Sequence, residues 1–287
     1  MNFKIGGVPE HFNYPIKNAI EQGAFENIGI DLQWSDIPEG TGSMCRKLRN
    51  GELDIAIVLT EGIVRDILDG NPSKIVQKYV KSPLIWGIHT PVNSTIQYPD
   101  QLSTARFAIS RNGSGSHIMA HVNANDQGFQ IEESQFVIVD NFDGALKAFE
   151  EDKADVILWE KYTTQPYVDA GTLRRIGECI TPWPCFVIAV NQKVLQKHPN
   201  MIWNLLWVIR KHCRIFMHDE NAPKIIAEAY GLKLHDATNW YHQTEWEQDI
   251  YISHKMLLNV GNTLVRAGVI PELGDIEDLC WNRTVFY

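Results

Sequence analysis

The feature that most constrains this chain is an alternation of short apolar runs with stretches of helical spacing. Phe3–Gly7 is rich in β-forming residues, and Phe12–Phe25 then carries apolar residues at helical spacing. Ile28–Trp34 alternates apolar and polar residues, Gly42–Asn50 predicts a short helix, and Asp54–Leu59 is a continuous apolar run typical of a strand buried on both faces. Because parallel neighbours need crossover helices, this order predicts an open, mostly parallel sheet.

Two further strand-like runs, Leu84–His89 and Cys185–Asn191, lie roughly a hundred residues apart. Between them the strand and helix patterns restart, and after them the pattern is helical almost to the end. A block inserted between two such strands is expected where a chain passes twice between two lobes. The sequence therefore predicts an α/β fold of two lobes, each a mostly parallel sheet flanked by helices, with a ligand cleft between them. Lobe one takes residues 1–88 and 192–287, and lobe two takes residues 89–191.

The charge of the chain argues against several classes of partner. The 287 residues are 44% hydrophobic and carry a formal net charge of −9. A nucleic-acid binder needs a basic stripe to displace counterions from phosphates, and an anionic membrane surface would repel an acidic protein. No run approaches the roughly 20 apolar residues of a bilayer span. We therefore expect a small-molecule ligand, no nucleic acid and no membrane insertion, and a homo-oligomer stays open.

The amino terminus and the cysteines bear on location and cofactors. Met1–Val8 predicts a strand rather than the basic and apolar segments of a signal peptide. A cytoplasmic protein is expected, or a periplasmic one if a leader was trimmed. The five cysteines are odd in number, widely spaced and without a CxxC pair, which predicts reduced thiols rather than disulfides or a zinc site. No cofactor is expected.

Several segments resemble the type II periplasmic-binding-protein fold. They are Lys4–Val8 with the helix that follows it, and Leu48–Ala56, which is similar to the element of that fold that ends the second helix and opens the third strand. The stretch from Ala145–Phe149 through Asp155–Glu160 resembles the same element in the second lobe. The similar branch contains the sulfonate, taurine and nitrate solute-binding proteins and the fungal thiamine-pyrimidine precursor synthases. The resemblance covers nearly the whole chain and implies the fold more than the ligand.

Two departures from that branch matter. Its secreted members carry a leader that this sequence does not show, and its fungal synthases carry a cysteine-rich iron motif and a sacrificial active-site histidine. The cysteine cluster has no counterpart here. The chain therefore looks more like a leaderless, cytosolic member.

Residues that follow each predicted strand are candidate ligand contacts, because ligands of open α/β sheets bind beyond the carboxyl ends of the strands. In chain order they are Glu10, His11, Thr60, Glu61, Ser110, Arg111, Gly113, Ser114, Gly115, Ser116, His117, Asn141, Trp159 and Glu160, with Trp183 from the loop before the second crossing strand.

The loop from Ser110 to His117 is the most informative of these. Its glycines allow close backbone approach, and the N–H groups and dipole of the following helix favour an anionic group. A serine that only caps this helix is the alternative interpretation, and the two uses are compatible.

The carboxylates and tryptophans among the candidate contacts bear on the part of the ligand that does not contact the 110–117 loop. Glu10, Glu61 and Glu160 together suit a ligand with amines or ring N–H donors, although each alone is typical of a solvated loop residue. Trp159 and Trp183 could stack on a planar ring or pack in a core.

The histidines do not predict catalysis. His11 and His117 are expected to face the cleft, but no nucleophile elbow, H-E-x-x-H or P-loop accompanies them. His121 follows His117 at a spacing that can place two metal ligands on one helix face, yet a lone pair of this kind is more often incidental. We predict no metal site and no catalytic residue.

The sequence thus predicts a binding protein that closes on its ligand by a hinge around Gly87–Thr90 and Ala189–Asn191. The expected ligand is small, polar or heteroaromatic, bears an amine or ring nitrogen, and carries an anionic group in some cases. Two alternatives stay open: an enzyme similar to the thiamine-pyrimidine precursor synthases, and the solute-binding component of an ABC transporter.

Overall fold

The chain folds into two compact units. The computed structural model describes residues 1–286. The second unit comprises Pro83–Pro182 and Thr263–Val269, and the first unit comprises the rest of the described chain. Each unit is an α/β structure built on one five-stranded sheet. The predicted fold class is confirmed.

The first sheet is mostly parallel. In spatial order its strands are β2 (Asp31–Asp36), β1 (Asn2–Gly7), β3 (Ile55–Leu59), β10 (Phe186–Asn191) and β4 (Ser73–Val80). β1 runs parallel to both β2 and β3, whereas β10 runs antiparallel to β3 and β4. All six residues of β10 are buried, as expected for a strand with a neighbour on each edge and helices on both faces.

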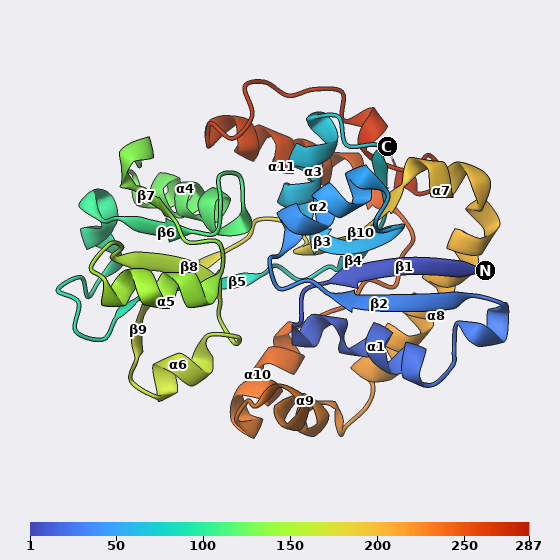
Figure 1. Ribbon diagram of the computed structural model, residues 1–287, viewed down its shortest axis with the longest axis horizontal. Helices are drawn as coiled ribbons and strands as arrows, with labels where there is room; N and C mark the ends of the chain where they lie inside the picture. The colour runs from blue at the N-terminus through green and yellow to red at the C-terminus, as the bar shows by residue number, and fades with distance from the viewer. Residues whose placement is uncertain (287) are drawn as a thin grey trace. The chain divides into compact units, whose positions relative to one another are not determined.

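Helices cover both faces of this sheet. Figure 1 shows α2 and α3 on one side of it and α1 and α8 on the other. The bounds in this unit are α1 (Tyr14–Glu21), α2 (Thr41–Asn50), α3 (Thr60–Leu68), α7 (Gln192–Lys197), α8 (Pro199–Met217), α9 (Ala222–Tyr230) and α10 (Leu234–Gln243). α2 ends where Gly51 takes the left-handed conformation, with φ of 72°, which a residue without Cβ adopts at no steric cost.

The second sheet repeats this strand order. Its strands are β7 (Phe136–Ile138), β6 (Phe107–Ile109), β8 (Val156–Glu160), β5 (Ile85–Pro91) and β9 (Leu173–Ile180). β6 is parallel to β7 and β8, and β5 is antiparallel to β8 and β9. The helices α4 (Gly115–Gln127) and α5 (Phe142–Glu150) are the crossovers of this sheet, and α6 (Gln165–Asp169) precedes β9.

The remaining elements are short or join the two units. α11 (His254–Arg266) begins in the first unit and ends in the second. The strands β11 (Ile252–Ser253) and β12 (Val285–Phe286) form a two-stranded parallel sheet. The 3₁₀ helices are η1 (His11–Asn13), η2 (Glu26–Ile28), η3 (Pro99–Thr104), η4 (Glu133–Gln135) and η5 (Glu277–Leu279).

The two five-stranded sheets contain two strands that the sequence analysis did not predict, β4 and β9. β4 carries Lys74 and Lys78, which interrupt its apolar pattern. In the structure Lys74 pairs with Asp278 and Lys78 pairs with Glu247, so each mostly buried ammonium group gains a carboxylate. A buried charge is tolerated only when it is paired, and here both partners lie far along the chain.

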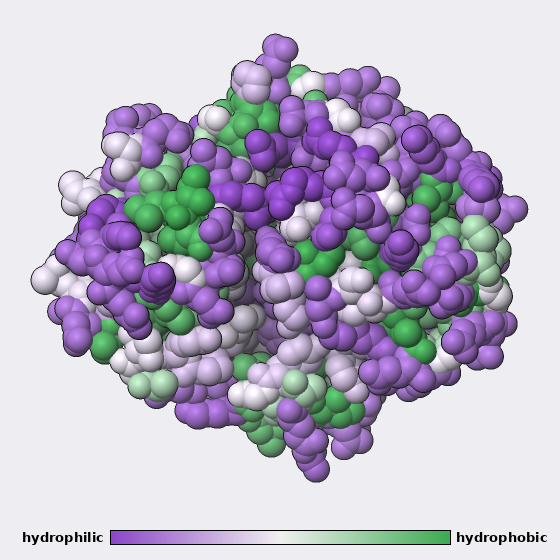
Figure 2. All heavy atoms as spheres, viewed as in Figure 1, coloured by the Kyte–Doolittle hydropathy of each residue, from purple (hydrophilic) through white to green (hydrophobic). Residues whose placement is uncertain are grey.

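The surface visible in Figure 2 is mostly hydrophilic. On the face shown in Figure 2, hydrophilic residues cover most of the surface and hydrophobic residues occur in separate groups. Among residues 1–286 no helix is both long enough and apolar enough to cross a membrane.

Candidate functional site

The residues after β3 begin a helix rather than a loop. Thr60 and Glu61 form the first turn of α3. The Thr60 N–H donates to the carbonyl of Cys185 at 3.0 Å, and its hydroxyl donates to the carbonyl of Pro184. Thr60 therefore holds the start of α3 against the segment that leads into β10.

Glu61 is the most unusual of the predicted contacts. Its side chain is fully buried, and the Trp183 indole N–H donates to Oε2 at 2.8 Å. Its other oxygen, Oε1, is buried and has no hydrogen-bond partner among the described residues. Burial raises the pKa of this carboxyl group from its ordinary value of 4.5 to about 7. Trp183, for which stacking on a ligand ring and packing in a core were both open, is a hydrogen-bond donor to a buried carboxylate.

The residues after β1 are used for packing. His11 is buried, and its ring stacks on Trp240 with centroids 4.3 Å apart. Tyr230 and Phe12 also contact this ring. Burial lowers the pKa of His11 to about 3, so the ring is neutral at physiological pH. Glu10 is partly exposed, and its carbonyl accepts from the Asn13 N–H to open η1.

The loop between β6 and α4 is closed by its own side chains. The Ser114 hydroxyl caps α4 by accepting from the His117 N–H at 3.3 Å, and the Ser116 hydroxyl accepts from the Ser110 N–H at 3.1 Å. Gly113 has φ of 71° and donates its N–H to Nδ1 of His117 at 2.9 Å. The half-exposed Arg111 precedes this turn.

The start of α4 offers N–H groups that lie beyond the reach of the helix's own carbonyls. Gly115 and Ser116 occupy its first two positions. Free N–H groups in the first turn of a helix favour an anion. Capping and ligand binding are therefore compatible here.

The residues near the ends of β7 and β8 are partly structural. Asn141 caps α5 by accepting from the Gly144 N–H at 2.9 Å, and Trp159 packs on Phe142 with ring centroids 5.5 Å apart. Glu160 is buried, and its Oε2 accepts from the Thr163 N–H at 2.6 Å. Burial raises the pKa of Glu160, and this hydrogen bond opposes the rise.

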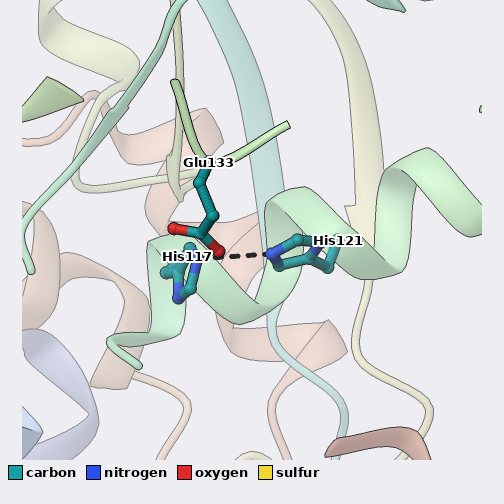
Figure 3. A group of neighbouring side chains, drawn as sticks. All are labelled: His117, His121 and Glu133. Carbon is teal, nitrogen blue, oxygen red and sulfur yellow. Dashed lines mark hydrogen bonds between the residues drawn. The ribbon is translucent and has the colours of Figure 1, made fainter. Parts of the chain in front are cut away.

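One group of possible metal ligands lies beside the second sheet. His117 and His121, both on α4, place their Nε2 atoms 3.3 Å apart, and Glu133 of η4 contributes a carboxylate (Figure 3). The candidate ligand atoms of the three side chains lie within 4.8 Å of one another. The histidine spacing is visible in the sequence, whereas no sequence signal indicates Glu133.

Within each unit the structure brings some of the predicted residues together. Thr60, Glu61 and Trp183 meet in the first unit, and the residues of the 110–117 loop meet in the second. The segments predicted as a hinge lie within β5 and β10. The role of all these residues in ligand binding stays a prediction.

Known proteins resemble this chain in sequence and in fold. The model of the Ca3427-like PBP family matches residues 86–179, about a third of the chain. The Candida albicans CA3427 gene product, described as having the generic periplasmic binding protein fold, is 28% identical, with 100% of this chain and 96% of that chain covered and a TM-score of 0.90. No curated protein sequence matches this chain significantly.

Two more distant structures share the fold. The alkanesulfonate-binding protein SsuA from Xanthomonas axonopodis pv. citri, bound to MOPS, is 12% identical, with 98% of each chain covered and a TM-score of 0.82. The periplasmic nitrate-binding protein NrtA from Synechocystis PCC 6803 is 14% identical, with 99% of this chain and 86% of that chain covered and a TM-score of 0.74. This chain therefore has a type II periplasmic-binding-protein-like fold.

Proposed function

We propose that this protein binds, without transforming it, a small polar or heteroaromatic molecule that bears an amine or ring nitrogen. The cleft expected between the lobes, and its closure around the ligand, belong to this proposal. The observation that carries it is the buried carboxylate of Glu61, which has one oxygen satisfied by Trp183 and one without a partner in the part of the chain that the structure describes.

The chemistry of Glu61 selects the ligand class. A buried polar atom without a partner is costly, and a carboxylate accepts hydrogen bonds but donates none when ionised. A ligand amine or ring N–H would supply the missing donor to Oε1. An anion at the same place would meet like charge, so Glu61 argues against a simple anion as the group bound there.

An anionic group elsewhere on the ligand is compatible with this proposal. The Gly115 and Ser116 N–H groups in the first turn of α4 suit a sulfonate, phosphate or carboxylate. The alkanesulfonate-binding and nitrate-binding proteins of similar fold bind anions by name, which supports an anion subsite in this one.

The chemistry of the predicted contacts supports the absence of turnover. A catalytic base or nucleophile must be activated and in reach of a substrate. His11 is neutral and packed among aromatic rings. All five cysteines are buried and none is in a disulfide bond, and burial raises the pKa of Cys179, Cys213 and Cys280, which disfavours the thiolate.

A solute-binding component of a transporter is the second candidate. Two structures of similar fold are described as the ligand-binding component of an ABC-type import system and as the sulfonate-binding protein of a putative ABC transporter. Binding of the ligand without turnover is common to both candidates, and a membrane partner distinguishes them.

The test begins with the small molecules that leave the freshly purified protein on denaturation, identified by mass spectrometry. Affinity for the released molecule is then measured by calorimetry in the wild type, in Glu61→Gln and in the matched control Glu52→Gln, an exposed glutamate of the first unit. Losing a charged hydrogen-bond partner costs about 1.5–3 kcal/mol, so Glu61→Gln is expected to weaken binding roughly tenfold or more.

The control is expected to bind as the wild type does. Glu160→Gln is expected to weaken binding less than Glu61→Gln, because the Glu160 carboxylate already accepts from Thr163. A released molecule without any N–H or cationic group, or conversion of that molecule during long incubation, would refute the proposal.

A further inference from the structure

We propose that His117, His121 and Glu133 bind a divalent transition-metal ion of the zinc class. The first argument is the histidine geometry. Two histidines at i and i+4 on one helix can point their rings at one ion. Ligand nitrogens about 2.0–2.1 Å from a tetrahedral zinc ion lie about 3.4 Å from each other. The Nε2 atoms of His117 and His121 are 3.3 Å apart.

The surroundings hold the two rings in place. The ring of Phe136, at the start of β7, packs edge-on against the His117 ring, with centroids 4.5 Å apart. Its centroid lies 5.1 Å from that of the His121 ring. His117 is buried and His121 is half-buried. The pair is therefore rigid before any ion arrives.

Glu133 supplies a third ligand that is free to move. Its side chain is exposed, so an ion could enter from that side. The backbone beside it is fixed, because the Gln135 side chain accepts from the Glu132 N–H at 2.9 Å and donates to the carbonyl of Ala105 at 2.9 Å. Rotation of the Glu133 side chain can therefore bring its carboxylate onto the ion. Three protein ligands leave a fourth position for water or another molecule.

The metal-free arrangement explains what binding would change. The Gly113 N–H donates to Nδ1 of His117, so the neutral His117 ring carries its proton on Nε2 and donates it to His121. An ion bound at Nε2 of His117 requires the ring proton to move to Nδ1. The Gly113 N–H then loses its acceptor, so binding of the ion is coupled to the 110–117 loop.

The test uses zinc alone, on protein stripped with a chelator, and does not depend on any other ligand. Competition with a chelating dye gives the affinity, and the visible spectrum of added Co²⁺ reports the coordination geometry. The wild type is expected to bind a single equivalent, with an intense Co²⁺ spectrum typical of four-coordination. Changes outside the first ligand shell typically cost 10–100-fold, so His121→Ala is expected to weaken binding by more than about 100-fold.

Further variants separate the site from non-specific binding. Glu133→Gln keeps the size of the side chain and is expected to weaken zinc binding roughly tenfold or more. His235→Ala removes an exposed histidine of α10 and is expected to change nothing. Circular dichroism of each variant checks that the fold is retained, and His121 is chosen over His117 because His117 also closes the loop.

The Gly113 amide provides an independent readout. Its ¹⁵N–¹H resonance is expected to shift on addition of zinc in the wild type and to stay in place in His121→Ala. Equal zinc affinities in the wild type and His121→Ala, or no zinc binding in the wild type, would overturn the site. If the Gly113 resonance does not shift when zinc binds, the proposed coupling between zinc binding and the 110–117 loop is wrong.

Discussion

The first and second sheets share one strand order but use their carboxylates differently. In each sheet a central parallel strand, β3 or β8, lies beside an antiparallel strand that enters from the other unit. Glu61 lies two residues beyond β3, and Glu160 is the last residue of β8. Both are buried, and burial raises the pKa of both.

The difference lies in the donors that surround each carboxylate. Glu160 accepts from the N–H of Thr163, three residues away, so it stabilises a local turn. Glu61 accepts from a distant side chain, Trp183, and keeps one oxygen without a partner. Burial alone therefore does not mark a ligand contact. Glu61 is the stronger candidate for a ligand contact, because one of its oxygens has no hydrogen-bond partner among the described residues.

The largest expected effect tests whether the two sheets are equivalent as structures. Ile57 of β3 pairs with Ile188 of β10, and Leu158 of β8 pairs with Ile88 of β5, and all four side chains are buried. Ile57→Ala and Leu158→Ala are each expected to lower the free energy of unfolding by about 2–5 kcal/mol, because each leaves a cavity. Urea unfolding of both variants measures the change in the free energy of unfolding. A loss below about 1 kcal/mol in either variant would show that the two sheets are not equivalent in packing.

The next effect tests the raised pKa of Glu61. A carboxyl group whose pKa rises on folding destabilises the folded state as pH rises from its ordinary value of 4.5 to about 7. At about 1.36 kcal/mol per pKa unit, the wild type without ligand is expected to lose about 3 kcal/mol over this window. Glu61→Gln removes the titration, so the stability curves of the two proteins should diverge between these pH values. Parallel curves would contradict the assignment.

The same titration predicts how binding depends on pH. A ligand N–H or cation prefers the ionised Glu61, so affinity is expected to rise with pH up to about 7 and to level off above it. Calorimetry of the released ligand at several pH values measures this rise.

A third effect concerns the donor to Glu61. Trp183→Phe keeps an aromatic ring and removes the indole N–H, so above pH 7 it is expected to cost about 1.5–3 kcal/mol of stability. Trp159→Phe serves as the control, because Trp159 packs on Phe142 at an aromatic contact. Equal costs in the two variants would mean that packing, rather than the hydrogen bond, explains the loss.

The smallest effect is expected at Glu160. Glu160→Gln keeps an amide oxygen that can accept from the Thr163 N–H, so it is expected to change the free energy of unfolding by less than about 1 kcal/mol. Glu160→Ala removes the acceptor and serves as the comparison. If Glu160→Gln lowers the free energy of unfolding as much as Glu160→Ala does, the negative charge of Glu160 rather than its local hydrogen bond stabilises the fold.

The hydrophobic periodicity, and the order of strand-like and helix-like segments along the chain, predicted most of this fold. The buried runs in β3 and β10 and the repeat of the pattern in the second unit indicated mostly parallel sheets with crossing strands. The sequence analysis did not predict β4 and β9, because charged residues interrupt their apolar pattern. In β4 the compensating carboxylates, Glu247 and Asp278, come from segments that no local pattern connects to it.

The candidate site was predictable only in part. The position of Glu61 follows from the end of β3, but the pairing of its Oε2 with Trp183 arises only through folding. Likewise the spacing of His117 and His121 is local, while Glu133 reaches them across a loop. Side chains that meet through tertiary structure leave no periodic signal.

The crossing strands also set the order in which the protein can assemble during synthesis. β5 to β9 are contiguous in sequence, so the second sheet can form while the chain is still being made. The first sheet cannot close then, because β10 lies between β3 and β4 and leaves the ribosome last of the five. The unit that begins the chain is thus the later one to finish, and until then the edges of β3 and β4 are open to chaperones or to misplaced strands.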